Sequence, residues 1–125
     1  MHDVILSLAS NRQQEQNLQE VRRRLGQILS DCFYSREIWT DPINSPRTDR
    51  YLNQLCQATT ALSFDELTQA LKTIEHDLGR TVADRQAGIV KADVDVLLFD
   101  GKRYHERDWD RIYVTSLIGD LKKNA

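Results

Sequence analysis

The sequence predicts an α+β protein in which two helices cover one face of an antiparallel sheet. Three observations lead to this fold class. Several short runs are rich in β-branched and aromatic residues, as strands are. Two longer segments repeat apolar residues every three or four positions, as helices do. With 40% apolar residues in 125 positions, the chain has the size and composition of one globular core. We therefore expect a single domain over residues 1–125.

The first half of the chain is predicted to contain three strands and one helix. Residues 3–8 form a short apolar run that is typical of a strand. A helix should follow, because the next apolar side chains recur on one helical face. These are Leu18, Val21, Leu25 and Ile28. Residues 32–40 and 51–60 have strand composition. The segment between them contains Pro42 and Pro46, which predict a loop.

The second half is predicted to contain one helix and one strand. Residues 63–66 form a capping box, in which the Ser hydroxyl and the Glu carboxylate can each accept an exposed amide. Gly79 predicts the end of this helix. Residues 81–88 have no clear period and are predicted to form an irregular loop, and residues 91–99 the fourth strand before a turn at 100–101. The order strand-helix-strand-strand-helix-strand is that of a ferredoxin-like sandwich.

The composition argues against several classes of function. A net charge of -2 and a pI near 5.9 disfavour a general nucleic-acid surface, which needs an excess of Lys and Arg on one face. No apolar run approaches the roughly 20 residues of a membrane span, and the first residues lack the features of a signal peptide. We therefore expect a cytoplasmic protein without nucleic-acid or membrane partners. The sequence contains no signal for an oligomeric state.

Cys32 and Cys56 fall in strands that we expect to be neighbours. In a cytoplasmic chain, both are expected to be buried free thiols. Neither belongs to a Cys-x-x-Cys motif, so neither predicts a zinc or redox site.

Asp93 and Asp95 are the pair of side chains that most suggests chemistry. Because side chains alternate along a strand, both should point to the same face, about 7 Å apart. Their neighbours should face the helices. These are Ala92, Val94, Val96 and Leu98. Two carboxylates this close repel each other unless a cation lies between them, and Mg²⁺ binds one or two carboxylates together with water and phosphate. The alternative is an ordinary solvated strand face.

Basic side chains flank this acidic pair along the chain. Arg80 follows the second helix, Arg85 and Lys91 precede the strand, and His105 and Arg111 follow it. Positive charge around a metal-carboxylate site is what polyphosphate binding requires. The sequence therefore favours a site that holds a divalent metal against a phosphate-bearing substrate.

A series of short motifs runs in order along nearly the whole chain. They are Ser7-Leu8-Ala9-Ser10-Asn11, Asp41-Pro42, Tyr51-Leu52-Asn53, Leu67, residues 74–80, residues 93–99 and residues 105–113. In this order and spacing they resemble 6-hydroxymethyl-7,8-dihydropterin pyrophosphokinase, a ferredoxin-like enzyme of folate synthesis. The resemblance implies an enzyme that transfers the terminal pyrophosphate of ATP to the hydroxymethyl oxygen of the pterin.

The resemblance also implies which residues bind metal and ATP. Asp93 and Asp95 would hold two magnesium ions, and Arg80 would act with them in catalysis. Four residues match family positions that contact ATP. These are Glu75, Arg80, His105 and Arg111. Such a transfer needs chiefly positioning and charge neutralisation from the protein.

For the pterin, the resemblance implies a pocket made by five residues. These are Asp41, Pro42, Tyr51, Asn53 and Tyr113. Tyr51 and Tyr113 match the aromatic positions that sandwich the pterin, and Asn53 matches the amide that binds its edge. A flat heterocycle buries well between aromatic rings, and an Asn amide offers it both a donor and an acceptor.

Each of these side chains also has a simpler interpretation. Glu75 and Arg80 could form a solvated pair at a helix end. His105 could be a surface histidine, and Tyr51 and Tyr113 could be partly buried aromatics of the sheet.

The chain departs from the family at several positions. Val82 and Val90 stand where the family has arginines, and Asp41 replaces a threonine. Ala9 and Tyr113 replace a usual Gly and Phe. The hairpin after the fourth strand is shorter, and most of the family's C-terminal region is missing. These differences thin the positive clamp on the triphosphate and predict slow turnover.

The leading hypothesis is therefore an ATP- and Mg²⁺-dependent pterin pyrophosphokinase. The alternative is a non-catalytic descendant that binds a nucleotide, a pterin or a protein partner. A third class, an RNA-binding ferredoxin-like module, would need stacked exposed aromatics and a basic surface where this chain has its acidic pair.

Overall fold

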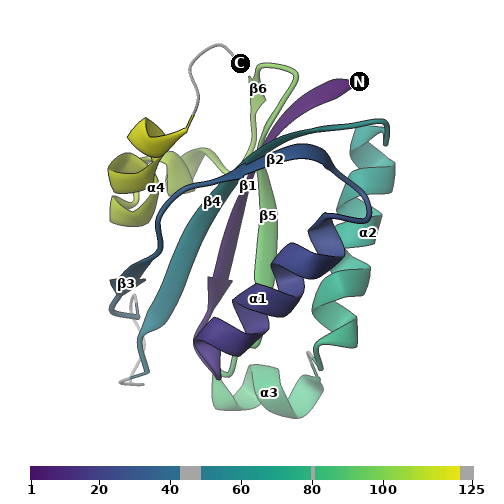
Figure 1. Cartoon of the computed structure of the whole chain (residues 1–125). Helices are drawn as coiled ribbons and strands as arrows, with labels where there is room; N and C mark the ends of the chain where they lie inside the picture. The colour runs from purple at the N-terminus through teal and green to yellow at the C-terminus, as the bar shows by residue number, and fades with distance from the viewer. Residues whose placement is uncertain (43–48, 80, 122–125) are drawn as a thin grey trace.

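The computed structural model describes residues 1–42, 49–79 and 81–121. Most of the predicted proline loop, including Pro46, and the predicted site residue Arg80 lie outside the described residues. Within these ranges one sheet forms the centre of the molecule, and helices lie on both of its faces (Figure 1).

In the described parts of the chain the sheet has six strands, and every pairing between them is antiparallel. The strands are β1 (His2–Ser10), β2 (Ser30–Tyr34), β3 (Ile38–Thr40), β4 (Tyr51–Thr60), β5 (Asp93–Phe99) and β6 (Lys102–Arg103). Their order is β2-β4-β1-β5-β6, and β3 also pairs with β4. With β2 and β3 taken as one interrupted strand, this is the ferredoxin-like order, so the predicted fold class is confirmed.

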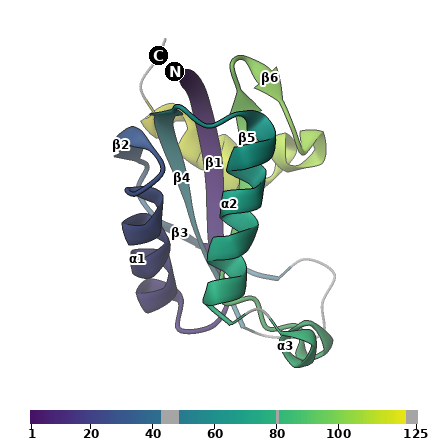
Figure 2. The same cartoon turned by 90° about the vertical axis from the view of Figure 1, so that its right-hand side faces the viewer.

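Two helices pack on one face of the sheet, α1 (Gln14–Leu25) and α2 (Phe64–Asp77), as Figures 1 and 2 show from two sides. Their buried side chains belong to the predicted apolar stripes, although Ile28 of the first stripe lies beyond the end of α1 and is only partly buried. The buried side chains are Leu18, Val21 and Leu25 of α1 and Leu67, Leu71 and Ile74 of α2. They join the side chains of Val4, Leu6 and Leu8 in one core. Each fully buried leucine stabilises the fold by about 1.5–3 kcal/mol.

The predicted signals at both ends of α2 are present. Ser63 Oγ accepts a hydrogen bond from the Glu66 amide at 3.2 Å, and Glu66 Oε1 accepts one from the Ser63 amide at 2.9 Å. Gly79 follows the helix with a φ of +97°, and Lys91 Nζ lies 2.9 Å from where its Cβ would be. Any other residue at this position would be strained and would displace the lysine.

The opposite face of the sheet is partly covered by α4 (Ile112–Leu117) and the 3-10 turn η2 (Ile118–Asp120). Their apolar side chains pack on three side chains of the sheet. These are Ile5, Leu55 and Leu97. This second core was not part of the predicted element order, because a six-residue helix is too short to display a helical period.

A β-bulge changes the predicted orientation of Leu98. The partner of Leu6 in β1 is Val96 of β5. The partner of Ile5 is Leu98, which leaves Leu97 as an extra residue. Val96 faces α1 and α2 as predicted, but Leu98 packs in the core under α4. The prediction that Leu98 faces α1 and α2 is therefore wrong, because strict alternation ends at the bulge.

Residues 32–40, predicted as one strand, are divided between β2 and β3. The Ser35 hydroxyl accepts a hydrogen bond from the Leu55 amide at 2.9 Å. The next amide, that of Arg36, donates to Asp120 Oδ2 at 3.0 Å, and the Arg36 guanidinium donates to the same carboxylate. The backbone therefore turns toward η2 here, and the ladder is interrupted.

Residues 81–88, predicted as an irregular loop, contain the helix α3 (Val82–Ala87). The Thr81 side chain accepts a hydrogen bond from the Asp84 amide at 3.0 Å, and Gly88 ends the helix with a φ of +73°. Within the described residues, α3 buries none of its side chains. It therefore has no apolar stripe from which it could have been predicted.

The two cysteines lie on paired strands, Cys32 on β2 and Cys56 on β4, and both are free thiols as predicted. Cys56 is buried, and burial raises the pKa of its thiol to about 12. Cys32 is only partly buried, so the prediction of a fully buried thiol is confirmed for Cys56 alone.

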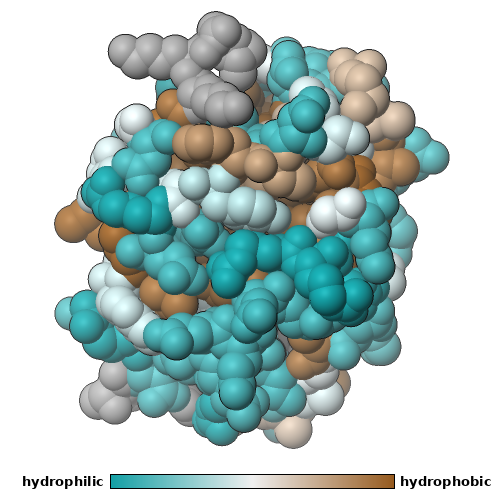
Figure 3. All heavy atoms as spheres, in the orientation of Figure 1, coloured by the Kyte–Doolittle hydropathy of each residue, from teal (hydrophilic) through white to brown (hydrophobic). Residues whose placement is uncertain are grey.

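The outer surface over α1 is hydrophilic, as the centre of Figure 3 shows. The arginines at positions 22–24 form ion pairs there, with Glu37, Glu20 and Asp77. The contacts with Glu37 and Asp77 join α1 to the segment before β3 and to α2. Among the helices of the described ranges, none has both the length and the apolar character needed to cross a bilayer.

Asn11, just after β1, ties down the segment that enters β5. Its side chain is buried, and Nδ2 donates to the Gly88 carbonyl at 2.9 Å. Asn11 Oδ1 accepts a hydrogen bond from the Val90 amide at 2.6 Å, and the Asn11 amide donates to the Val90 carbonyl at 2.8 Å. The side chain thereby orients the chain just before Asp93.

Asn11→Ala should lower the free energy of unfolding by about 1–3 kcal/mol, because two partly buried backbone groups lose their partner. Chemical denaturation measures the change. The matched control is Gln86→Ala, which removes an exposed amide from α3 and should alter stability by less than about 0.5 kcal/mol. If Asn11→Ala is as stable as this control, the hydrogen bonds of Asn11 do not hold the segment.

Candidate active site

The half of the sheet face that α4 leaves uncovered forms the floor of a cavity. In the strand register, Ser7 of β1 lies opposite Asp95 of β5. Ala9 lies between Asn53 of β4 and Asp93 of β5. Because the two central side chains are small, the longer ones on either side enclose a hollow of about 690 Å³.

Most of the residues that the sequence singled out line this cavity. They are Asp41, Pro42, Tyr51, Asn53, Asp93, Asp95, Arg111 and Tyr113. Glu75 and His105 lie beside Asp95, although they are not part of the lining. The fold thus gathers segments from β3, β4, β5 and α4, far apart in sequence, around one space.

Glu75 of α2 meets the acidic pair at the open edge of β5. Its Oε2 accepts a hydrogen bond from the Val94 amide at 2.8 Å, a strand-edge donor that would otherwise face solvent. One carboxylate oxygen from each of Glu75, Asp93 and Asp95 lies within 4.8 Å of the others. Carboxylate oxygens are the ligands that Mg²⁺ prefers, so this donor set fits the metal.

Asp95 also lies next to a second group of side chains. His105 Nε2 is 3.9 Å from Asp95 Oδ1, and ligand atoms of Asp95, His105 and Asp108 lie within 4.8 Å of one another. Arg111 Nε is 3.9 Å from Asp108 Oδ1. His105, Asp108 and Arg111 come from the ends and middle of the 3-10 turn η1 (Glu106–Asp110).

The Asn53 side chain is buried and fixed in orientation. Its Nδ2 donates to Thr40 Oγ1 at 2.8 Å and, more weakly, to the carbonyls of Ile38 and Tyr51 at 3.3 Å. With its donor so occupied, the amide offers a bound ligand chiefly the acceptor Oδ1. The sequence had predicted that the Asn53 amide offers both a donor and an acceptor, and the structure leaves chiefly the acceptor. Thr40, which the sequence did not single out, holds the Asn53 side chain in this orientation.

Tyr51 and Tyr113 line the cavity from different elements, Tyr51 from the start of β4 and Tyr113 from α4. Burial raises the pKa of Tyr113, and the negative charges of Asp108, Asp95 and Asp93 raise it further. The Tyr113 hydroxyl therefore stays protonated close to the acidic residues. The Tyr113 side chain therefore lies where the aromatic part of the cavity meets its acidic part.

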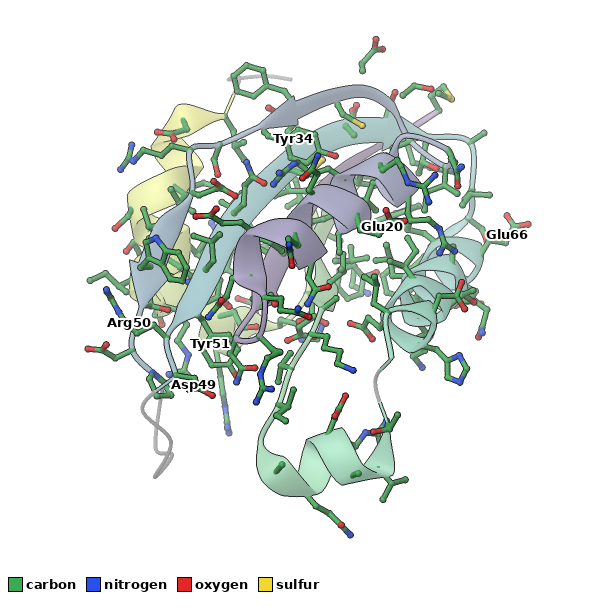
Figure 4. All side chains as sticks on the ribbon, turned by 60° about the horizontal axis from the view of Figure 1, so that its bottom comes forward. Glu20, Tyr34, Asp49, Arg50, Tyr51 and Glu66 are labelled. Carbon is green, nitrogen blue, oxygen red and sulfur yellow. The ribbon has the colours of Figure 1, made fainter. Side chains whose placement is uncertain are left out.

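An ion pair stands at the mouth of the cavity. Arg50 Nε lies 3.3 Å from Asp41 Oδ1, and the Arg50 guanidinium also donates to the Trp39 carbonyl at 3.3 Å. Figure 4 shows Asp49, Arg50 and Tyr51 together where the chain enters β4, beside β3. Arg50 thus links the two segments that border Tyr51.

The segment before β5 supplies less positive charge than the sequence suggested. Lys91 Nζ lies 3.4 Å from Asp84 Oδ2 and packs against Gly79. Arg85 is exposed on α3, as is Val82, whose side chain is 69% exposed. The lysine is therefore occupied in tying α3 to the end of α2.

Sequence reasoning missed several residues of the cavity lining, among them Thr40, Arg50 and Asp108. Thr40 pairs directly with Tyr51, but the register between these two strands does not follow from the sequence. Asp108 had no signal in the sequence either. It lies in a charged run that resembles a solvated surface, and only the 3-10 turn directs it toward Asp95.

Comparisons with known proteins agree with this arrangement. The chain matches the family of 7,8-dihydro-6-hydroxymethylpterin-pyrophosphokinase (HPPK) over residues 5–123. It belongs to the HPPK family. The match confirms the resemblance seen in the motifs, and it includes every element that borders the cavity.

Named relatives of the HPPK family match this chain over only part of their own length. The mitochondrial folate synthesis bifunctional protein of Arabidopsis thaliana is 32% identical over 138 residues, which is 99% of this chain and 24% of that protein. The 2-amino-4-hydroxy-6-hydroxymethyldihydropteridine pyrophosphokinase of Bacillus subtilis (strain 168) is 30% identical over 90 residues, 66% of this chain and 53% of that protein. The chain therefore spans about a quarter of the plant relative and about half of the bacterial one.

Because the pKa of Tyr113 is raised, the free energy of unfolding should fall as the pH rises through the alkaline range. Above the ordinary tyrosine pKa of about 10, the unfolded chain releases this proton while the folded chain keeps it, so rising pH favours unfolding. In Tyr113→Phe, the loss of stability between about pH 9 and pH 11 should be smaller than in the unmutated protein. Denaturant titrations at both pH values measure it. Equal losses in both proteins would contradict the buried, acid-flanked environment of the hydroxyl.

Proposed function

We propose that this chain transfers a pyrophosphoryl group from Mg-ATP to the hydroxymethyl oxygen of 6-hydroxymethyl-7,8-dihydropterin. The observation that supports this most is the shared cavity. Aromatic and amide side chains suited to a flat heterocycle line the same 690 Å³ hollow as carboxylates suited to metal-bound phosphates. The name of the Bacillus subtilis relative, a pterin pyrophosphokinase, agrees with this proposal.

In the proposed reaction, the pterin hydroxymethyl oxygen forms a bond to the β-phosphorus of ATP. The bond from that phosphorus to the oxygen bridging the α-phosphate breaks, AMP leaves, and the hydroxyl proton is released. Because little covalent help is needed, the protein contributes chiefly by alignment and by neutralising charge.

The pterin would occupy the end of the cavity that β3, β4 and α4 enclose. Its ring would lie between Tyr51 and Tyr113, whose faces bury a flat heterocycle well. Asn53 Oδ1 would accept a hydrogen bond from an N–H on the ring edge, since Thr40 holds the amide in that orientation. Asp41 and Pro42 would border the ring at the mouth.

The triphosphate would occupy the end near β5. Asp93 and Asp95 would hold two Mg²⁺ ions there, with Glu75 beside them; when bound, the ions neutralise the phosphate charge. We also assign Glu75, His105 and Arg111, together with Arg80, to the ATP site. Arg111 lines the cavity, and His105 lies within 3.9 Å of Asp95.

We further infer slow turnover. Charge that spreads over the transferring phosphoryl oxygens is stabilised by well-placed arginines. Val82 supplies none, and Lys91 is paired with Asp84. These two observations favour a second candidate function, a non-catalytic protein that binds the same nucleotide and pterin.

The proposal is tested by following conversion of ATP to AMP with hydroxymethyl-dihydropterin present. Asp95→Asn should reduce the rate at least 100-fold, equivalent to about 2.7 kcal/mol, because a metal-binding carboxylate is lost from an otherwise unchanged strand. The matched control is Asp31→Asn on β2, whose left-handed φ of +53° an asparagine tolerates. Its rate should equal that of the unmutated protein.

Calorimetry on the unmutated protein separates the two candidates. If it binds both the pterin and a Mg-ATP analogue but forms no AMP, the non-catalytic alternative is correct. If it binds neither, both candidates are wrong.

A further inference from the structure

Asp95 is shared by two separate groups of potential metal ligands. On one side lie Glu75 and Asp93, and on the other lie His105 and Asp108. The resemblance to the family assigns Asp93 and Asp95 to metal and His105 to ATP, but it assigns nothing to Asp108. The second group therefore calls for its own explanation.

The 3-10 turn accounts for the position of Asp108. The Asp108 amide donates to the His105 carbonyl at 2.8 Å, and the Arg111 amide donates to the Asp108 carbonyl at 2.9 Å. His105 precedes the turn with a left-handed φ of +54°. Ligand atoms of His105 and Asp108 thereby lie within 4.8 Å of each other and of Asp95.

Asp95 and Asp108 are close, and both are partly withdrawn from solvent. Their side chains are 30% and 26% exposed. Arg111 Nε lies 3.9 Å from Asp108 Oδ1, too far for a hydrogen bond. The negative charges of both carboxylates raise the pKa of Tyr113. Two such carboxylates repel each other unless a positive charge lies between them.

We propose that Asp95, His105 and Asp108 hold a first-row divalent cation, Mn²⁺ in preference to Mg²⁺, in the free protein before ATP binds. The mixed donor set gives this preference: two carboxylates suit Mg²⁺ and Mn²⁺ alike, but an imidazole nitrogen favours the transition metal. His105 then reaches the triphosphate through this ion. The inference deepens the proposed function, since Asp95 lies between this position and the one beside Asp93.

The test is a titration of the free protein with Mn²⁺, followed by electron paramagnetic resonance, without nucleotide or pterin. Asp108→Asn should weaken the binding of one Mn²⁺ at least tenfold, because a charged ligand becomes a neutral one of the same shape. The matched control is Asp110→Asn, an exposed carboxylate in the same turn, which should leave the affinity unchanged. Asp93→Asn should also leave this ion bound. Mg²⁺ is added as a competitor, and it should displace the bound Mn²⁺ only at a higher concentration than an equal affinity would require.

Thermal melting of each variant without metal excludes unfolding as the cause, and the isosteric change at a partly exposed side chain should preserve the fold. Failure to bind Mn²⁺ without nucleotide overturns the proposal. So does an Asp108→Asn protein with unchanged affinity, or equal weakening by Asp110→Asn, which would indicate only nonspecific attraction of cations. The titration contains no ATP and no pterin, so its result does not depend on the proposed reaction. Mn²⁺ binding can be found in a protein that forms no AMP, and AMP formation can be found in a protein that does not bind Mn²⁺ alone.

Discussion

The pairing of β1 with β4 on one side and β5 on the other is the constraint on which the rest of the structure depends. It places Ala9 between Asn53 and Asp93, and Ser7 opposite Asp95. The same alternation sends Val4, Leu6 and Leu8 of β1 into the core under α1 and α2. A slip of β1 by one residue would expose these leucines and turn Ser7 and Ala9 toward the core. The core therefore fixes the register, and the register positions the cavity.

The sheet face opposite α1 and α2 is divided into a covered half and an open half. Where β1 and β5 present Ile5 and Leu97, the elements α4 and η2 pack against them. Where the same strands present small and acidic side chains, the face stays open as the cavity. The bulge at Leu97 marks the change, because it brings both Leu97 and Leu98 to the covered half. Since α4 packs on the covered half, Tyr113 is held at the border of the cavity.

The sequence predicted those parts of the fold that follow from periodic patterns. The stripes of α1 and α2, the capping box at Ser63 and the common face of Asp93 and Asp95 all follow from spacing alone. What it could not predict depends on tertiary contacts. The break after Ser35 follows from the hydrogen bonds of Arg36 to Asp120, a residue distant in sequence. The helices α3 and α4 are too short for a period, and α3 is stabilised at its ends by Thr81 and Gly88 rather than by burial.

The candidate site divides in the same way. Tyr51, Asn53 and Asp95 lie on strands, where alternation fixes the direction of a side chain, and they line the cavity together. Thr40 and Asp108 acquire their positions from pairing with another strand and from a 3-10 turn. The family match identified the first set through its motifs. The second set is particular to the folded chain.

The central claim is that one cavity on the open sheet face receives both a flat heterocycle and metal-bound phosphates. A ¹⁵N–¹H NMR titration with hydroxymethyl-dihydropterin, Mg²⁺ and α,β-methylene-ATP tests it most directly. The account predicts shifts at the Asn53 side-chain amide and at the backbone amides of Val94 and Tyr113. Shifts confined to the hollow of about 440 Å³ at the other end of the sheet, around Gln57 and Leu98, or no shifts at saturating ligand, would contradict it.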